Sequence, residues 1–142
     1  MKKIKSFCLI FSMLLTLPLI LNGQEEKLIN ECSDYFKSPF ITTGQPMTAL
    51  LTGDEVAEFH TTLYEETLYR LVSCSKETDM FNFSVFDKEH NLLFTSKEHT
   101  NVEYWDFKMK GSIECIIEAR LNSKKASSGI VLLMLGFKSL SN

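Results

Sequence analysis

The stretch that decides the fold is Ile113-Glu114-Cys115-Ile116-Ile117-Glu118-Ala119-Arg120-Leu121. Every second residue from Ile113 to Leu121 is apolar, and the residues between them are mostly charged. A period of two is typical of a strand with one face buried and one face in water. Residues 129–137 are apolar on both faces, which predicts a central strand covered on both sides. An N-terminal helix is the expected cover on the second side.

The period of two extends outward from these strands over the chain from Gln45 onward. Turn-forming residues separate the runs at intervals of about 8–12 residues, which is typical of a sandwich or barrel. No helical segments separate them, so a parallel α/β sheet is disfavoured. We predict an all-β fold, an antiparallel jelly-roll-like β-sandwich of about eight strands with a short N-terminal helix. The expected strands are 47–52, 56–63, 68–75, 80–87, 91–95, 102–109, 113–121 and 129–138.

Two groups of residues carry a resemblance to a known family. The first comprises Leu51-Thr52-Gly53, Thr62-Leu63 and Tyr69-Arg70-Leu71-Val72, and the second comprises residues 83–94. They resemble the opening strands and the Val-x-Asp-x-x-Gly-Asn-Leu hairpin of bacterial pre-peptidase C-terminal-type β-sandwich domains, although Glu89-His90 stands where that family commonly has a glycine. The resemblance covers residues 49–137 and carries no catalytic signature. It implies a jelly-roll-like accessory module of exported proteins, here standing almost alone.

The first 23 residues have the pattern of a secretory signal peptide. Lys2, Lys3 and Lys5 precede an apolar run over residues 7–21, and Gly23 precedes the polar residues that begin at Gln24. The alternative is an uncleaved anchor helix, but the run is shorter than the roughly 20 residues of a span. We expect cleavage between Gly23 and Gln24. The predicted organisation is a leader over 1–23, a helix over 24–37 within an N-terminal segment of residues 24–44, and a β-sandwich over 45–142.

The net charge of the processed chain indicates which classes of partner it is expected to bind. The full chain has 15 basic and 18 acidic residues, and loss of the three leader lysines leaves 12 basic residues and a formal charge of −6. Nucleic-acid binders are basic because phosphate contacts supply most of their affinity. We therefore expect no nucleic-acid partner. Because the apolar run belongs to the leader, we expect no membrane span in the processed form, and export through the leader places that form in the periplasm or outside the cell. An unidentified envelope protein or glycan is the expected partner.

Three cysteines remain after loss of the leader: Cys32, Cys74 and Cys115. An exported protein of this kind is expected to contain a disulfide. Three pairings are possible, with three free thiols as the alternative. We favour a disulfide between Cys74 and Cys115, since both fall within predicted strands. Cys32 falls on the apolar stripe of the predicted helix, so we interpret it as a core residue.

Sequence motifs for catalysis are missing. The chain has no Gly-x-Ser-x-Gly elbow, His-Glu-x-x-His motif or phosphate loop. We expect no catalytic site, no metal site and no cofactor. His60 falls in a predicted strand, and His90 and His99 fall in turns where solvation is expected. A nucleophilic pair of His60 with Cys74 or Cys115 is the weaker alternative.

Turn carboxylates and aromatic residues are the remaining candidates for ligand binding. Asp54-Glu55, Glu65-Glu66 and Asp87-x-Glu89 lie at predicted turns and lack the spacing of a calcium loop, so solvated turns are favoured over calcium sites. Strand parity places Trp105 in the core and leaves Tyr64 and Tyr104 as exposed contacts.

These features together predict a non-catalytic exported binding or accessory module of the bacterial cell envelope. A self-associating envelope scaffold is the first alternative. A small secreted hydrolase is the second, and it would need a deep polar cleft that holds His60 beside a carboxylate.

Overall fold

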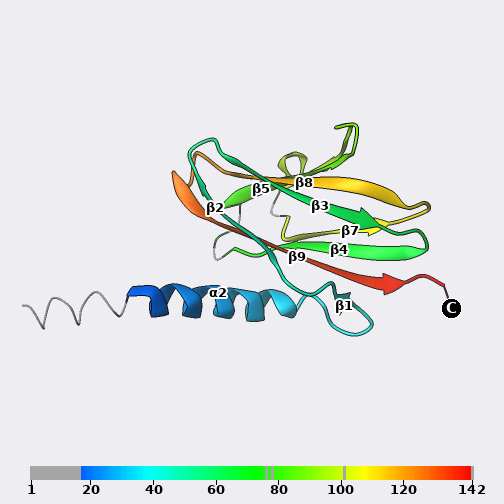
Figure 1. The fold of residues 1–142 in the computed structure, drawn as a ribbon, viewed down its shortest axis with the longest axis horizontal. Helices are drawn as coiled ribbons and strands as arrows, with labels where there is room; N and C mark the ends of the chain where they lie inside the picture. The colour runs from blue at the N-terminus through cyan, green and yellow to red at the C-terminus, as the bar shows by residue number, and fades with distance from the viewer. Residues whose placement is uncertain (1–16, 76, 78, 101, 142) are drawn as a thin grey trace, which may run out of the picture.

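The structure is a computed structural model that describes residues 17–75, 77, 79–100 and 102–141. Two antiparallel sheets face each other, and one helix lies across the outside of one sheet (Figure 1). The elements are α2 (Leu17–Ser33), β1 (Ile41–Thr42), β2 (Met47–Thr52), β3 (Val56–Leu63), β4 (Thr67–Ser73), β5 (Phe81–Asp87), β6 (Leu92–Thr95), the 3₁₀ turn η1 (Ser96–Glu98), β7 (Tyr104–Lys108), β8 (Ile113–Leu121) and β9 (Ser128–Ser139).

The strand pairing is that of a long hairpin rolled into a sandwich. β2 pairs with β9, β3 with β8, β4 with β7, and β5 with β6, all antiparallel. When this hairpin folds over on itself, β4 also pairs with β9 and β5 also pairs with β8. One sheet has the order β1-β9-β4-β7, with β2 also paired to β9, and the other has the order β3-β8-β5-β6. This nested order is a jelly roll, so the predicted all-β sandwich is confirmed.

Alternating side chains of the two sheets fill the space between them. Phe83, Leu71, Ile117, Val131 and Leu133 are at most 2% exposed. They belong to one apolar cluster drawn from both sheets, as expected where two inner faces interdigitate. Leu132 and Met134 of β9 point the opposite way and form a second cluster with residues of the N-terminal segment. The predicted cover on both sides is therefore confirmed for residues 131–136, whereas Ile130 is 42% exposed.

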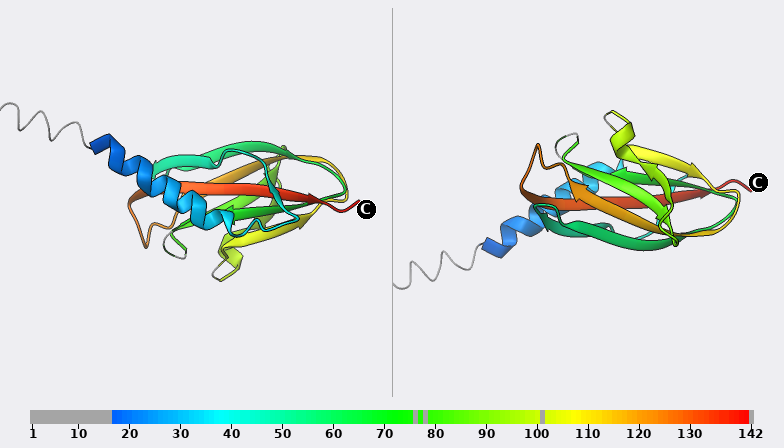
Figure 2. Two further views of the ribbon diagram at one scale, coloured as in Figure 1. Left: turned by 90° about the horizontal axis from the view of Figure 1, so that it is seen from below. Right: turned by 90° about the horizontal axis from the view of Figure 1, so that it is seen from above.

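The helix is fastened to the outer face of the five-stranded sheet (Figures 1 and 2). Cys32 and Phe36 pack on Val72, Leu132 and Met134. Cys32 also forms a disulfide with Cys74, while Cys115 is a free, buried thiol. The favoured Cys74–Cys115 pairing is therefore wrong. Cys115 points into the space between the sheets, whereas Cys74 points out of the sandwich toward the helix, so the sheet itself separates the two sulfurs.

Several predicted bounds shift at the ends of elements. The helix ends at Ser33 instead of residue 37, because Tyr35 and Phe36 turn back with amide hydrogen bonds to the carbonyls of Cys32 and Ser33. It begins at Leu17, so it includes the last residues of the predicted leader. The cut after Gly23 stays a prediction, and residues 1–16 lie outside the described residues. None of the described helices is long and apolar enough to span a membrane.

Among the strands, 47–52, 56–63 and 113–121 have the predicted bounds. The expected strand over 102–109 is shorter, at Tyr104–Lys108, and the one over 68–75 ends at Ser73. β1 and η1 were not predicted, because elements of two and three residues are too short for a periodic pattern.

Candidate functional site

The helix α2 lies on the far side of the sandwich from the outer face of the four-stranded sheet, as the view from above in Figure 2 shows. Strand parity turns a second set of side chains of β3 and β8 toward this open face. They are Glu58, His60 and Thr62 of β3 and Glu114, Ile116, Glu118 and Arg120 of β8. Ile116 and Glu118 are only 7% and 9% exposed although they point outward. Neighbouring side chains therefore shield the centre of this face from water.

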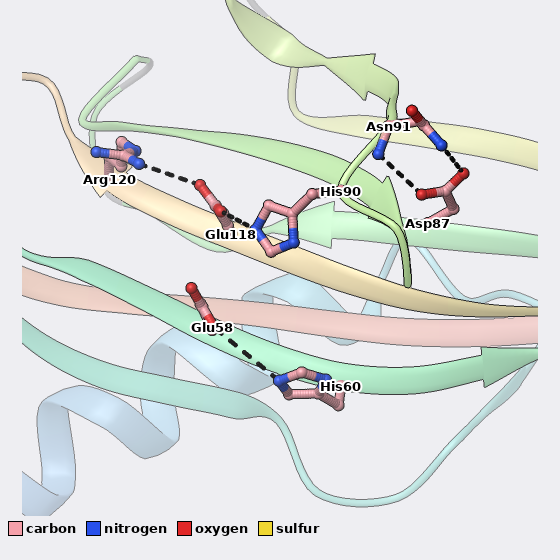
Figure 3. Close-up of polar contacts among 7 residues, drawn as sticks. All are labelled: Glu58, His60, Asp87, His90, Asn91, Glu118 and Arg120. Carbon is pink, nitrogen blue, oxygen red and sulfur yellow. Dashed lines mark hydrogen bonds and ion pairs between the residues drawn. The ribbon is translucent and has the colours of Figure 1, made fainter.

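Two carboxylates face each other at the centre of this surface. Glu58 of β3 is the register partner of Glu118 of β8. Arg120 Nη2 lies 3.2 Å from Glu118 Oε2, and His90 Nε2 lies 3.4 Å from Glu118 Oε1 (Figure 3). One carboxylate oxygen of Glu118 thus contacts a permanent cation, and the other contacts an imidazole that is charged only when protonated.

His90 reaches this position from the tight turn between β5 and β6. Its backbone has φ 63° and its amide donates to the carbonyl of Asp87. The Asp87 carboxylate accepts hydrogen bonds from the side chain and the backbone amide of Asn91, and these two bonds lower the pKa of Asp87. The His90 ring stacks on Phe86 with centroids 5.4 Å apart. The turn predicted to be solvated therefore holds its histidine against the sheet, although the His90 side chain is 55% exposed.

His60 lies on the same face but not in a deep cleft. Its Nε2 is 4.0 Å from Glu58 Oε2, and its side chain is 70% exposed. Two open hollows of about 330 and 410 Å³ share Thr62, Lys88 and Glu114, and His60 lines the first. Cys115 faces the core, where burial raises the pKa of its thiol, and Cys74 is bonded to Cys32. The geometry therefore does not form the cysteine–histidine pair considered from the sequence.

Two of the turn carboxylates, those of Glu55 and Asp87, accept hydrogen bonds within their own turns. Glu55 accepts hydrogen bonds from the backbone and hydroxyl of Thr52, which lower the pKa of Glu55. Asp87 holds Asn91 in the same way. Within the described ranges, the one group of potential metal ligands is Glu58, His90 and Glu118, whose donor atoms all lie within 4.8 Å of one another. None of the sequence-predicted calcium candidates belongs to it.

The aromatic candidates lie elsewhere. Trp105 packs against the core, 4.5 Å from the ring of Phe94 and 4.6 Å from the ring of His99, which agrees with its predicted place. Tyr104 and Tyr64 are 41% and 61% exposed. Tyr104 lies on the other sheet, where the Arg70 guanidinium stacks on its ring at 4.3 Å. These tyrosines are exposed as predicted, but strand pairing does not bring them together.

Sequence reasoning missed the grouping of residues 58, 90 and 118. The alternation of side chains in residues 113–121 indicated only that Glu118 and Arg120 point into water. The register of β3 against β8, and the return of the 87–91 turn over the sheet, depend on tertiary pairing. No spacing along the chain encodes them.

The geometry defines an antiparallel jelly-roll sandwich with one covered and one open outer face. No protein-family model and no curated protein match this chain, so the resemblance to pre-peptidase C-terminal-type domains stays a prediction. Among solved structures, the chain is similar to PliG of Aeromonas hydrophila, a periplasmic inhibitor of g-type lysozyme. The identity is 12% and the TM-score 0.49, and the match covers 72% of this chain and 90% of that one.

Proposed function

We propose that this protein is an exported, non-catalytic binding module of the bacterial cell envelope that binds an envelope protein or glycan. The outer face of the four-stranded sheet is the proposed binding surface. The observation that carries the proposal is the unequal covering of the two sheets. The helix and the Cys32–Cys74 disulfide cover part of one outer face. The other outer face brings together Glu58, His90 and the buried Glu118 from three separate segments.

Two features support export. The lysine-rich and then apolar residues 1–23 have the pattern of a signal peptide. The disulfide is the second, because such bonds persist in oxidising compartments and are rare in the cytosol. The described helix side chains that pack on the sheet begin at Leu28. Cleavage after Gly23 would therefore leave this packing in place.

The chemistry of the open face favours a protein with a basic surface over a glycan. Glu58, Glu114 and Glu118 face outward with Arg120. Asp87, Lys88 and Glu89 line the hollow beside Glu114, so acidic groups outnumber basic ones on this face. Opposite charges on two surfaces favour association. Sugar sites commonly present an aromatic ring to the ligand. On this face, however, the Phe86 ring is stacked beneath His90, and Trp105 lies in the core.

The test is retention of a partner by the immobilised protein from an envelope extract. The expected result is one specific partner, whose purified form binds wild type and binds the charge-reversal variant E114K at least tenfold more weakly. The matched control is E31K on the helix, on the opposite side of the sandwich, and it is expected to bind like wild type. Equal binding by E114K and wild type would refute the surface assignment. Reproducible hydrolysis of an ester, peptide or glycoside by the purified protein would refute the non-catalytic assignment.

A self-associating scaffold is the second candidate, and one contact favours it. Leu50 and Ile130 are register partners on the outer face of the five-stranded sheet and are 71% and 42% exposed. Exposed apolar side chains on an edge strand favour association. Light scattering over a range of concentrations separates the candidates, since a scaffold gains mass with concentration and the variant L50K loses that gain.

A further inference from the structure

We propose that Glu58, His90 and Glu118 form a binding site for a divalent transition metal ion, of which Zn²⁺ is the best fit. The three side chains come from β3, the β5–β6 turn and β8, and their donor atoms lie within 4.8 Å of one another. Figure 3 shows the His90 ring and the two carboxylates directed into the same region above the sheet. The inference does not rest on the proposed partner, because metal binding is measured with the protein alone.

The charge balance of the cluster leaves room for a cation. Like charges directly opposite each other on neighbouring strands destabilise a sheet, and Glu58 and Glu118 are such a pair. The permanent cation in contact with Glu118 is Arg120, and it binds Oε2. The other oxygen, Oε1, faces His90, which is charged only when protonated. An imidazole beside two carboxylates is a ligand set that a divalent ion completes.

The distance between the ligand atoms of His90 and Glu118 already fits a bound zinc ion. Two ligand atoms bound tetrahedrally at about 2.1 Å from one ion lie about 3.4 Å apart. His90 Nε2 and Glu118 Oε1 are 3.4 Å apart without any movement. Glu58 has to move closer. Its side chain is 48% exposed, so rotation about its side-chain bonds meets little packing.

Supporting contacts hold the first two ligands in place. Arg120 orients the Glu118 carboxylate through the oxygen that the metal does not need. The His90 ring is stacked on Phe86, and its turn is closed by hydrogen bonds between Asp87 and Asn91. Such outer contacts orient metal ligands and raise metal affinity. The open side of the cluster faces solvent, which leaves the fourth position to water or to a group of a partner.

The donor types select the class of ion. One imidazole nitrogen and two carboxylate oxygens suit Zn²⁺ and its transition-metal neighbours. Ca²⁺ and Mg²⁺ take oxygen ligands, with six or more for Ca²⁺. A site with one nitrogen and two side-chain oxygens therefore disfavours both of them.

The test is titration of the untagged, chelator-treated protein with Zn²⁺ alone at neutral pH, followed by calorimetry. We expect one Zn²⁺ per chain with a micromolar Kd, at least about tenfold weaker in H90N and in E118Q. E114Q is the matched control for E118Q, because Glu114 lies on the same strand and face but outside the cluster. Its Kd is expected to equal that of wild type. Circular dichroism establishes that each variant is folded.

Two further measurements keep the proposal falsifiable if E118Q does not fold. E58Q alters an exposed ligand and is expected to weaken Zn²⁺ as well. The visible spectrum of the Co²⁺-substituted protein is expected to change in H90N, which reports the nitrogen ligand directly. The proposal is overturned by the lack of saturable Zn²⁺ binding, by Zn²⁺ binding that survives both H90N and E58Q, or by tighter binding of Ca²⁺ than of Zn²⁺.

Discussion

Glu58 and Glu118 stand opposite each other on neighbouring antiparallel strands, with Arg120 and His90 on either side of Glu118. A sheet selected for stability alone would place an opposite charge or an apolar residue across from Glu118. The pair therefore costs stability when no cation lies between the carboxylates. Functional sites commonly contain such locally unfavourable arrangements.

Removal of the like-charge pair should stabilise the metal-free protein. We expect E58Q to raise the free energy of unfolding by up to about 1 kcal/mol, since it relieves the repulsion between opposed carboxylates. The measurement is urea denaturation in the presence of a chelator. E114Q is the control, because its register partner is the neutral Thr62. An equal gain in both variants would mean that the effect comes from net charge and not from this pair.

The disulfide should link the helix to the sheet in the oxidised protein. Peptide mapping without reductant is expected to recover Cys32 joined to Cys74, with Cys115 unmodified until the chain unfolds. The double variant C32S/C74S should lose about 4 kcal/mol of stability, from the loop-closure entropy of a bridge that spans 42 residues. C115S is the control and should retain the bridge. A recovered Cys74–Cys115 peptide would contradict the structure.

Gly136 should tolerate no side chain, because Phe36 lies directly above it. A Cβ at this position would lie 2.4 Å from Cδ1 of Phe36 and 3.1 Å from the carbonyl oxygen of Ile41. We expect G136A to cost about 1–3 kcal/mol through overpacking, measured by thermal unfolding.

G111A is the matched control for this substitution, since a Cβ there meets nothing within 4 Å. The double variant F36A/G136A should lose less than the sum of the single variants, because the smaller side chain removes the clash. Strict additivity would show that Phe36 is not the obstacle.

Arg70 should be the main polar link between β4, β7 and the N-terminal segment. Its guanidinium donates two hydrogen bonds of 2.7 Å to Asp106 and one to the carbonyl of Tyr35, and stacks on the ring of Phe40 at 4.4 Å. We expect R70K to lose about 1–2 kcal/mol, since a lysine cannot form the two-pronged contact. A double-mutant cycle with D106N measures the coupling. Zero coupling energy would contradict this role.

The Tyr35 hydroxyl should lose its proton only at high pH. Its hydroxyl donates a hydrogen bond to the Glu103 carboxylate, and this bond, partial burial and the negative charge of Glu103 raise the pKa of Tyr35 to about 12. The folded phenol keeps its proton above pH 10.0, where the phenol of the unfolded chain loses it. This contribution to stability is therefore full below pH 10 and disappears as the pH rises toward 12.

Ultraviolet titration measures this ionisation. One of the four phenols is expected to ionise near pH 12 in wild type and at lower pH in E103Q. In the variant Y35F the phase near pH 12 should vanish. A late phase that persists in Y35F would assign the raised pKa to another tyrosine.

The amino-acid sequence by itself determined the class of fold and much of its layout. Alternation in residues 113–121 and 47–52 gave strands with the predicted bounds, since a half-buried strand needs a period of two. The doubly apolar run within 129–137 predicted a strand covered on both faces, and the two clusters around β9 confirm it for residues 131–136.

Tertiary structure alone decided the disulfide and the candidate metal site. Pairing of Cys74 with Cys32 depends on which side of the sheet each thiol faces, and sequence separation does not state this. Glu58, His90 and Glu118 lie 28 to 60 positions apart along the chain. They meet because the rolled hairpin sets β3 against β8 in one register and returns the β5–β6 turn over that face. Such groups arise from long-range strand pairing, which the local secondary-structure preferences of the residues do not encode.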